Sequence, residues 1–467
     1  AGAAEQARDK LGGTLDALVS RGKLAAEAAA SALARIAPAA RLADGASAGL
    51  VVEAIVENLD AKRALFRELE QLVDASAVLA TNTSSISVTA IANGLAQPGR
   101  LVGMHFFNPV PLMKLVEVIS GLRTEPEVAA AVFALAQAWG KVPVHAKSTP
   151  GFIVNRIARP FYAEALALLL EQAATPQVLD TCMKAAGFRM GPCELMDLIG
   201  HDTNFAVTNS VYEANFYDKR YQPSLVQREM VAGGLLGRKS GQGFYGYPDA
   251  MPALPVAVHE APATAREVVV HGAGALADHL ERAAAQALAA QGWGPARARA
   301  SAWSGLEIDG ARLMLTDGRP AFAVARSAGV ADIAVFDRVC AAAPAPGYAL
   351  AYALNEGAST PWRAQAGAWL AALGFTPLEV GDAPGLVVAR TVAMLVNEAS
   401  DAVLQGVCTP EGADSAMKLG VNHPRGPFEW LREWSVAGVI DVVAALDAMY
   451  CGDRYRASPW LHRRATV

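Results

Sequence analysis

A histidine and a glutamate stand out as side chains that could act together on a proton. His105 follows the apolar run 101–104, and Glu117 is the lone charged residue of the run 115–119. A carboxylate in such a run is buried unless its strand lies at an edge, and a buried carboxylate stays ionised only beside a partner. Beside a carboxylate, imidazole becomes a better base, which suits removing a proton from an alcohol as hydride departs. A structural histidine and a glutamate paired elsewhere fit the spacing equally well.

Two further polar residues are candidates for the same cleft. Ser84 lies in the polar turn 82–85 directly after a predicted strand, and Asn155 lies at the start of a predicted helix. Serine in such a turn and asparagine in a first helical turn often only cap backbone donors. For both residues, a purely structural role as a cap is therefore an alternative to a role in the cleft.

The elements that would hold these side chains alternate between strand and helix. Apolar runs at 49–55, 77–81 and 101–107 predict buried strands, and residues 59–73 predict a helix. This alternation is typical of a parallel sheet with helices on both faces. Ligands of open α/β sheets bind beyond the carboxyl ends of the strands, so His105 and Ser84 are expected to face one cleft.

The rest of the chain divides by pattern. Residues 1–35 predict two helical pieces with a break at Gly22, and the chain turns almost wholly helical from about 150 to 247. A Pro- and Ala-rich stretch, a second alternating region and a second helical region follow. We expect domains at 1–148, 149–248, 263–383 and 384–467, with a linker at 249–262. In the third domain we expect strands at 267–270, 311–315, 321–325, 333–336 and 348–353, and a helix at 361–373.

An internal repeat links the two helical regions. Pro-Gly-Phe-Ile-Val-Asn-Arg at 150–156 returns as Pro-Gly-Leu-Val-Val-Ala-Arg at 384–390, an offset of 234 residues. The register continues through Glu164 with Glu398, Thr175-Pro176 with Thr409-Pro410 and Asp180 with Asp414, and after a one-residue slip through Gly191-Pro192 with Gly426-Pro427. These matches predict a duplicated unit. The second copy has Ala389 in place of Asn155, so we expect chemistry only in the first.

A glycine motif in the second half has the layout of a dinucleotide fingerprint. Residues 268–277 read as a strand, then Gly-Ala-Gly-Ala-Leu-Ala, then a helix. No acidic residue ends a second strand about 20 residues later, as such a site requires. We therefore expect a relic of duplication in preference to a working second nucleotide site.

Composition narrows the classes of protein. The 467 residues are 53% hydrophobic and 18% charged, which is typical of a globular chain with several cores. A net charge of −5 without a Lys/Arg stripe disfavours nucleic acid and anionic membranes as partners. Five scattered cysteines support neither disulfides nor a zinc site, so we expect no metal and a reducing cytoplasm. No membrane span or signal peptide is predicted.

Five motifs in order resemble the L-3-hydroxyacyl-CoA dehydrogenase family, and the length is similar to that of its long bacterial members associated with phenylacetate breakdown. They lie at 53–58, 81–85, 105–109, 150–156 and 237–245. The resemblance implies a Rossmann-like sheet domain and an all-α domain, both duplicated. The implied reaction is NAD-dependent oxidation of an L-3-hydroxyacyl-CoA to the 3-oxoacyl-CoA, in phenylacetate or fatty-acid degradation.

The resemblance also implies roles for single residues. His105 is implied as the catalytic base and Glu117 as the carboxylate that orients and polarises it. Ser84 would hydrogen-bond the substrate oxygen, and Asn155 would help to hold the reacting group. Lys23 resembles a basic position that meets the CoA nucleotide. Positions that match cofactor contacts are Glu57, Lys62, Asn82, Ser84, Asn108 and Lys239.

The chain departs from the family pattern at its start. Members begin with a strand, a GxGxxG loop, a helix and a second strand, and we expect this chain to start after all four. His201 stands where the family usually has an apolar residue, and we assign it no role. Two alternatives stay open: a dehydrogenase of the same architecture for a free hydroxy acid, and a non-catalytic acyl-CoA-binding protein. Single-copy members dimerise through the helical domain, so we expect the second copy to mimic that interface, with homo-oligomers also compatible.

Overall fold

The structure is a computed structural model that describes residues 2–249, 254, 259–289, 292–298, 300–340 and 345–465. The chain forms two compact units, Ala1–His105 with Val118–Leu135, and Phe106–Glu117 with Ala136–Val467. Most of the predicted linker, 250–253 and 255–258, lies outside the described residues.

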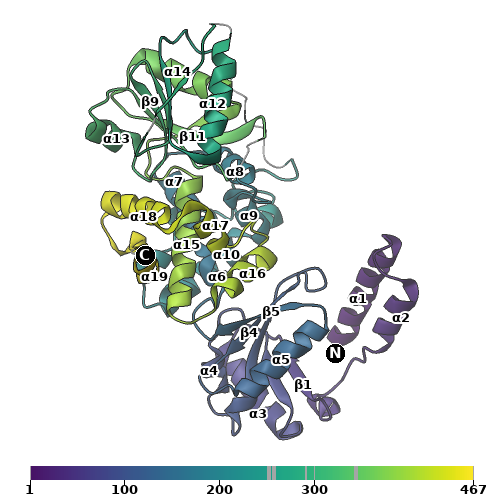
Figure 1. The fold of residues 1–467 in the computed structure, drawn as a ribbon. Coiled ribbons are helices and arrows are strands. Elements are labelled where there is room, and N and C mark those ends of the chain that lie inside the picture. The colour runs from purple at the N-terminus through teal and green to yellow at the C-terminus, as the bar shows by residue number, and fades with distance from the viewer. Residues whose placement is uncertain are drawn as a thin grey trace. The chain divides into compact units, whose positions relative to one another are not determined.

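The first unit begins with two helices and continues with strand–helix alternation, as predicted (Figure 1). Its elements are α1 (Ala3–Ser20), α2 (Ala26–Ala34), η1 (Leu42–Gly45), β1 (Leu50–Glu53), α3 (Leu59–Leu72), β2 (Val78–Thr81), α4 (Val88–Ala92), η2 (Pro98–Arg100), β3 (Leu101–Phe106) and most of α5 (Pro126–Ala138). With β4 (Leu115–Ser120) and β5 (Val142–Lys147), the sheet has the order β1–β2–β3–β4–β5. β1 pairs with β2, and β2 with β3, in parallel, so these three carboxyl ends lie along one edge.

The predicted burial of the run 49–55 is wrong for most of its residues. β1 is an edge strand of the described sheet, and Glu53 is its one buried residue. Val52, Ile55 and Val56 are exposed by 40%, 43% and 68%. Apolar side chains therefore meet solvent at and just beyond the carboxyl end of β1.

The second unit contains two helical segments and a second sheet. The first segment has α6 (Val154–Ile157), α7 (Arg159–Leu170), α8 (Pro176–Ala185), α9 (Pro192–Ile199), α10 (His201–Ala214), η3 (Lys219–Tyr221), α11 (Leu225–Ala232) and η4 (Arg238–Ser240). The second has α15 (Val388–Leu404), α16 (Pro410–Gly420), α17 (Pro427–Trp434), α18 (Val436–Tyr450), η6 (Asp453–Tyr455) and α19 (Pro459–Ala465). Residues 388–402 of α15 are all buried, and α15 packs against α7, α17, α18 and α19.

The second sheet is mixed. Its elements are β6 (Val268–His271), α12 (Gly274–Leu288), β7 (Ala296–Arg297), β8 (Gly305–Ile308), β9 (Ala311–Leu315), α13 (Ala321–Ala328), β10 (Ile333–Phe336), β11 (Tyr348–Leu354), α14 (Thr360–Ala372) and β12 (Phe375–Glu379). The order is β12–β11–β10–β9–β8–β6–β7, with β8 antiparallel to both its neighbours. Apolar residues of α12 and α14 share one core with the strands, and those of α13 belong to another.

One predicted strand of this sheet is a helix. Residues 321–325 open α13, where the Asp382 carboxylate accepts the amide protons of Ala321 and Phe322 at 2.5 and 2.8 Å. Pro320 is the N-cap residue of α13, and its backbone is extended, so the chain enters the helix from an extended conformation. A short apolar run does not by itself distinguish a strand from a helix, and the capping Asp382 is 61 residues away from Ala321.

Backbone conformations recur between the two helical segments at the spacing of the sequence repeat. Gly151 and Gly385 have φ of 75° and 70°, and the residues after them, Phe152 and Leu386, have φ of 47° and 49°. Left-handed conformations are uncommon for residues other than glycine, so their recurrence at matched positions is specific. The conformation that follows each Pro-Gly pair is therefore the same in both segments.

Buried ion pairs recur between the segments with their partners exchanged. Arg156 Nε lies 2.6 Å from Glu398 Oε1, and Arg390 Nε lies 2.6 Å from Glu164 Oε2. All four side chains are at most 4% exposed. Each arginine of one segment thus neutralises the glutamate of the other.

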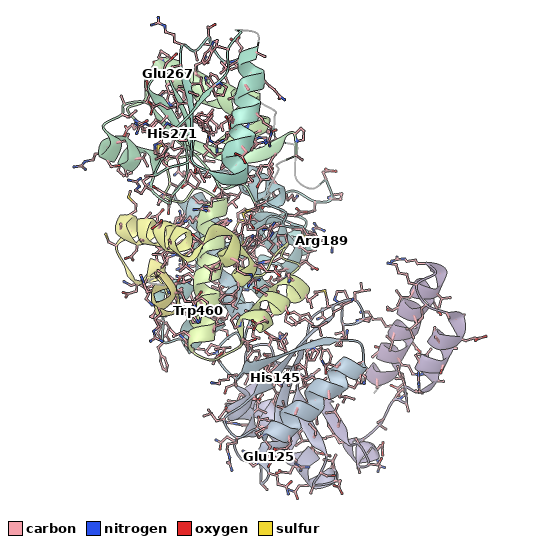
Figure 2. The ribbon with its side chains drawn as sticks, viewed as in Figure 1. Glu125, His145, Arg189, Glu267, His271 and Trp460 are labelled. Carbon is pink, nitrogen blue, oxygen red and sulfur yellow. The ribbon has the colours of Figure 1, made fainter. Side chains whose placement is uncertain are left out.

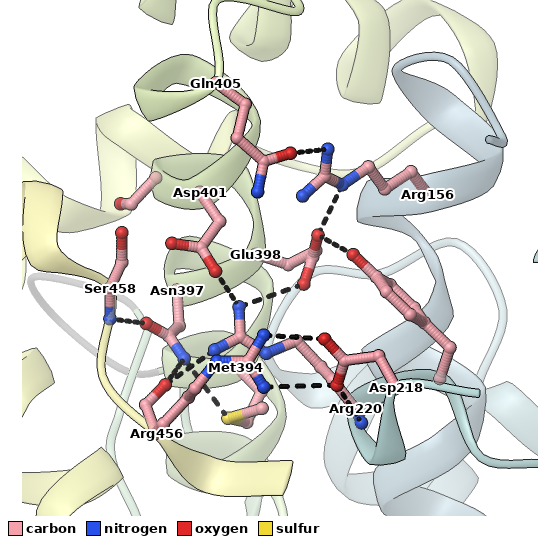
Figure 3. A network of polar contacts seen from close by, with 12 residues as sticks. Arg156, Asp218, Arg220, Met394, Asn397, Glu398, Asp401, Gln405, Arg456 and Ser458 are labelled. Carbon is pink, nitrogen blue, oxygen red and sulfur yellow. Dashed lines mark hydrogen bonds and ion pairs between the residues drawn. The ribbon is translucent and has the colours of Figure 1, made fainter. Parts of the chain in front are cut away.

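A tyrosine and a further arginine complete each pair. Tyr221 donates to Glu398 at 2.6 Å, and Tyr455 donates to Glu164 at 3.1 Å. Arg220 and Arg454 contact the same two carboxylates at 3.3 and 3.0 Å. Figure 3 shows the half around Glu398, where Arg220 also pairs with Asp401. Burial opposes ionisation of Glu164, but the Arg454 and Arg390 charges hold its pKa below the usual value.

We expect Glu398→Gln to destabilise the protein by about 3–5 kcal/mol, because it leaves buried arginines without their counter-charge. Urea unfolding of the full chain measures the change. Glu429→Gln is the matched control, since Glu429 forms its ion pair with Lys418 at a partly exposed position. A loss below about 1 kcal/mol for Glu398→Gln, within the usual range of a surface pair, would contradict the expectation.

Candidate active site

One carboxylate holds the turn that follows β2. Glu57 Oε1 accepts hydrogen bonds from the Thr83 hydroxyl at 2.7 Å and from the amides of Ser84 and Ser85 at 2.9 and 3.0 Å. The hydroxyls of Ser84 and Ser85 also donate to it, at 3.3 and 3.0 Å. Glu57 follows β1, so this contact fixes the carboxyl-end turns of two neighbouring strands to each other.

Burial alone would raise the pKa of Glu57, but hydrogen bonds from Thr83, Ser84 and Ser85 and the Lys62 charge lower it from 4.5 to about 2. Glu57 is therefore ionised at neutral pH. The ionised carboxylate stabilises the turn that carries Ser84, because it accepts the hydrogen bonds of that turn.

Lys62 lies beneath this turn. It is 1% exposed, and its Nζ lies 2.6 Å from Glu53 Oε1 and 3.3 Å from Glu57 Oε2. Glu53 also accepts from the Ile55 amide and the Thr81 hydroxyl, both at 2.7 Å. The resemblance implied Lys62 as a cofactor contact, and in the structure its ammonium group neutralises two carboxylates. Glu53 was missed, although it is a lone acid in an apolar run just as Glu117 is.

His105 lies near the carboxyl end of β3 and is 6% exposed. In the same unit, the backbone amide of Asn82 donates to the Glu53 carbonyl at 2.8 Å, which continues the pairing of β1 with β2. Glu57, Asn82, Ser84 and His105 therefore come from the carboxyl ends of three consecutive parallel strands, which is where we expected Ser84 and His105. This edge is where open α/β sheets bind ligands.

Glu117 is completely buried in β4, as predicted. Its Oε1 accepts the amide protons of Ile153 and Val154, each at 3.0 Å, at the start of α6, which carries Asn155. In the second half Asp337, just after β10, accepts in the same way from the amides of residues 387, 388 and 389. Part of the function of Glu117 is thus to cap a helix, and an acid keeps that function where no histidine corresponds to His105.

The remaining residues singled out in the sequence are three exposed side chains and one buried histidine. Asn108 is exposed, and so is Lys23, between α1 and α2. Lys239, in η4, is 43% exposed and forms an ion pair with Asp202. His201 is buried, and its Nε2 lies 2.8 Å from Asp197 Oδ1, which also accepts from the Phe244 amide. The position of His201 is that of a structural side chain.

The glycine motif of the second half forms the predicted strand and helix, β6 and α12. His271, labelled in Figure 2, stacks on Trp303 with ring centroids 4.0 Å apart. A Cβ atom on Gly272 would lie 2.4 Å from the Ser304 hydroxyl oxygen, so this loop packs tightly against its own unit. Close internal packing of the loop fits the expectation of a relic.

In the part of the chain that the structure describes, no group of three or more His, Cys, Asp or Glu could hold a metal ion. Over the same residues, no helix has both the length and the apolar composition that crossing a membrane requires.

Three parallel strands with a polar cluster at their carboxyl ends, joined in sequence to an all-α region, are typical of a Rossmann-type dehydrogenase. Comparison with known families agrees. The model of "3-hydroxyacyl-CoA dehydrogenase, NAD binding domain" matches residues 1–149, and that of the "C-terminal domain" matches both 151–247 and 385–466. A "3-hydroxybutyryl-CoA dehydrogenase reduced Rossmann-fold domain" matches 313–384. The chain belongs to the 3-hydroxyacyl-CoA dehydrogenase family.

Individual relatives match either almost the whole chain or about half of it. It is 41% identical to the 3-hydroxyadipyl-CoA dehydrogenase of Escherichia coli K12 over 99% of its length and 90% of that protein. It is 45% identical to a probable 3-hydroxybutyryl-CoA dehydrogenase of Deinococcus radiodurans, over 50% of this chain and 84% of that one. A crystal structure of 3-hydroxybutyryl-CoA dehydrogenase from E. coli K12 matches with a TM-score of 0.88 and 39% identity, covering 100% of this chain and 91% of that one.

The protein is thus an NAD-dependent oxidoreductase that oxidises the CH–OH group of 3-hydroxyacyl-CoA esters. The residues present fit this cofactor. The exposed side chains of Ile55 and Val56 offer an apolar surface for a ring, beside the polar turn held by Glu57. Both lie at the carboxyl edge of the first sheet, where such folds bind nucleotides.

We expect the stabilisation contributed by ionised Glu57 to be present above about pH 4.5 and to be lost as the pH falls toward 2, because folding lowers its pKa. The difference in unfolding midpoint between wild type and Glu57→Gln should therefore shrink over this interval. Urea titrations at several pH values measure it, with Glu68→Gln, an exposed position on α3, as the control. A pH-independent difference would contradict the expectation.

Proposed function

We propose that the first half of the chain carries out the oxidation, with His105 as the general base and Glu117 as the carboxylate that orients and polarises it. The observation that carries the proposal is the burial of Glu117: a carboxylate with 0% exposure, tied by two amides to the start of the helix that bears Asn155. A charge is costly at such a position. The buried Glu117 carboxylate would stabilise the imidazolium ion that His105 forms during turnover.

In the proposed reaction the His105 imidazole accepts the proton of the substrate 3-hydroxyl group as the C3–H bond breaks and the C3–O bond becomes a carbonyl. When bound, NAD supplies the acceptor for the hydride. Ser84 hydrogen-bonds the substrate oxygen, and Asn155 helps to hold the reacting group. In the reverse direction the His105 imidazolium returns the proton to the oxygen.

We further assign the binding groups. Glu57, Asn82, Ser84, Asn108 and Lys239 would hold the cofactor, and Lys62 would act on it through Glu57, because Lys62 itself is buried. Lys23 would meet the CoA nucleotide. A reducing cytoplasm suits the five cysteines, none of which is in a disulfide.

For the acyl group we propose a short chain with a second carboxylate. The E. coli relative that is 41% identical over almost the whole chain is named for 3-hydroxyadipyl-CoA, which has such a group. Oxidation of a dicarboxylic hydroxyacyl-CoA would be a step in the breakdown of phenylacetate or of a fatty acid.

We also propose that the two halves are copies of one sheet-plus-helices unit, with domains at 1–148, 149–248, 263–383 and 384–467, and that the second helical copy replaces the partner of a dimer. The exchanged pairs Arg156–Glu398 and Arg390–Glu164 support this, since a two-fold axis requires every contact to occur twice with the partners reversed.

His105→Gln should lower kcat by at least about 10²–10⁴-fold, because glutamine cannot accept the hydroxyl proton. NADH formation from 3-hydroxybutyryl-CoA measures turnover, and calorimetric titration checks that NADH and the CoA ester still bind. His145→Gln is the matched control, a histidine on β5 outside the proposed machinery. Near-normal turnover of His105→Gln would refute its assignment as the base.

Removal of residues 384–467 should cause self-association or aggregation, because it uncovers the faces of α7 and η3 that contact α15 and η6. Light scattering with size-exclusion chromatography measures the mass of the shortened chain against that of the full one. A well-folded monomer after truncation would rule out the proposed substitution for a dimer partner.

A further inference from the structure

A cavity of about 440 Å³ lies between the two helical segments of the second unit. Its walls come from α7, α10, η3 and α11 of the first segment and from residues 450–455 of the second. The catalytic proposal assigns no function to this cavity. A volume of 300–1,000 Å³ is usual for a small-molecule site.

Arg159 lines this cavity and differs from the other buried arginines around it. It is 6% exposed, its Nε donates to the Asn155 carbonyl at 2.8 Å, and its Nη1 donates to the Thr208 hydroxyl at 3.1 Å. Its guanidinium carbon lies 4.9 Å from the centre of the Tyr162 ring. Among the residues that the structure describes, no carboxylate forms an ion pair with it, whereas Arg156 pairs with Glu398 and Arg390 pairs with Glu164.

A buried cation without a counter-ion is unfavourable, and neutral partners compensate only in part. Burial accordingly lowers the pKa of Arg159, with Tyr162 offsetting part of the effect. An arginine keeps its proton in proteins, so the charge persists. An anion in the cavity would remove this cost.

The other charges that line the cavity leave Arg159 without compensation. Arg220 pairs with Glu398 and Asp401, and Arg454 pairs with Glu164. Glu171 accepts a hydrogen bond from Tyr450 at 2.7 Å and lies 3.7 Å from Arg390. Lys219 is exposed and adds a second positive charge.

We propose that Arg159 is a specificity-determining residue that binds the distal carboxylate of a dicarboxylic acyl-CoA substrate. The inference rests on the proposed function, which places the reacting group at Asn155. Arg159 opens α7 four residues after Asn155, and its Nε donates to the Asn155 carbonyl oxygen at 2.8 Å, so the guanidinium group lies next to the residue that would hold the reacting group. Recognition of a carboxylate by guanidinium is the pairing that charge-assisted hydrogen bonds favour.

The test compares two substrates of equal carbon number on the full-length chain, (S)-3-hydroxyadipyl-CoA and (S)-3-hydroxyhexanoyl-CoA. Wild type should prefer the first in kcat/KM. Arg159→Gln should lower kcat/KM for the dicarboxylic substrate roughly 10- to 100-fold, and should leave the value for the hexanoyl ester within about 3-fold. The ratio between substrates is independent of the folded fraction of each preparation, so partial misfolding of a variant does not mimic the result.

Two variants sharpen the comparison. Arg159→Lys keeps the charge and should retain part of the preference, and Arg228→Gln, an exposed arginine of α11, should keep all of it. Equal losses for both substrates in Arg159→Gln, or a wild type without preference, would overturn the inference. If free adipate changes the wild-type rate only while Arg159 is present and the two esters react alike, the cavity binds a separate anion and the proposal for the acyl chain fails.

The outcome also separates this inference from the proposed function. Turnover of both esters with an unchanged ratio in Arg159→Gln contradicts only the assignment of Arg159. No NADH from either ester by a wild-type protein that still binds NADH contradicts the proposed function itself.

Discussion

Charge buried between the two helical segments is the constraint on which the second unit depends. α15 is surrounded by protein over most of its length, yet it carries Arg390, Glu398 and Asp401 into that interior. These charges are tolerated because each finds its opposite on the other segment, Arg390 with Glu164 and Glu398 with Arg156. The same contacts fix α7 and the residues just before it. The start of the first helical segment, with Asn155 and Arg159, is therefore held by residues more than 200 positions away in the sequence.

Each half of the chain has a buried acid that caps the start of a helix, and in the first half we propose that this acid also acts in catalysis. Glu117 and Asp337 both cap the start of a helix by accepting consecutive amide protons. Burial raises the pKa of Asp337 to about 6, against the effect of those hydrogen bonds. A buried acid therefore caps a helix start in both halves. What distinguishes the first half is the additional presence of His105 and Asn155, so the proposed chemistry adds to a carboxylate that the fold already uses.

Much of this arrangement could be predicted from sequence, because its signals are local. The runs that became β2, β3 and β4, the buried Glu117, and the helical segments all follow from apolar periodicity. The errors have non-local causes: the position of β1 in the sheet set the exposure of Val52, and Asp382 made a helix of the run from Ala321. The burial of Lys62 depends on two acids that only the fold brings together. The Arg-Tyr pairs at 220–221 and 454–455 stand at the repeat offset and could have been found by extending the alignment.

The exchange of partners across the two segments has a consequence for how this chain can diverge. If the segments are copies, the second has lost the asparagine that the first keeps at position 155, and a buried alanine, Ala389, stands in its place. Arg390 and Glu398 cannot drift in the same way, because each is the counter-charge of a residue in the first segment. A region can thus be released from selection for chemistry while remaining under selection for the stability of its neighbour. Such a region would keep its charged interior long after the residues of its own active site have gone.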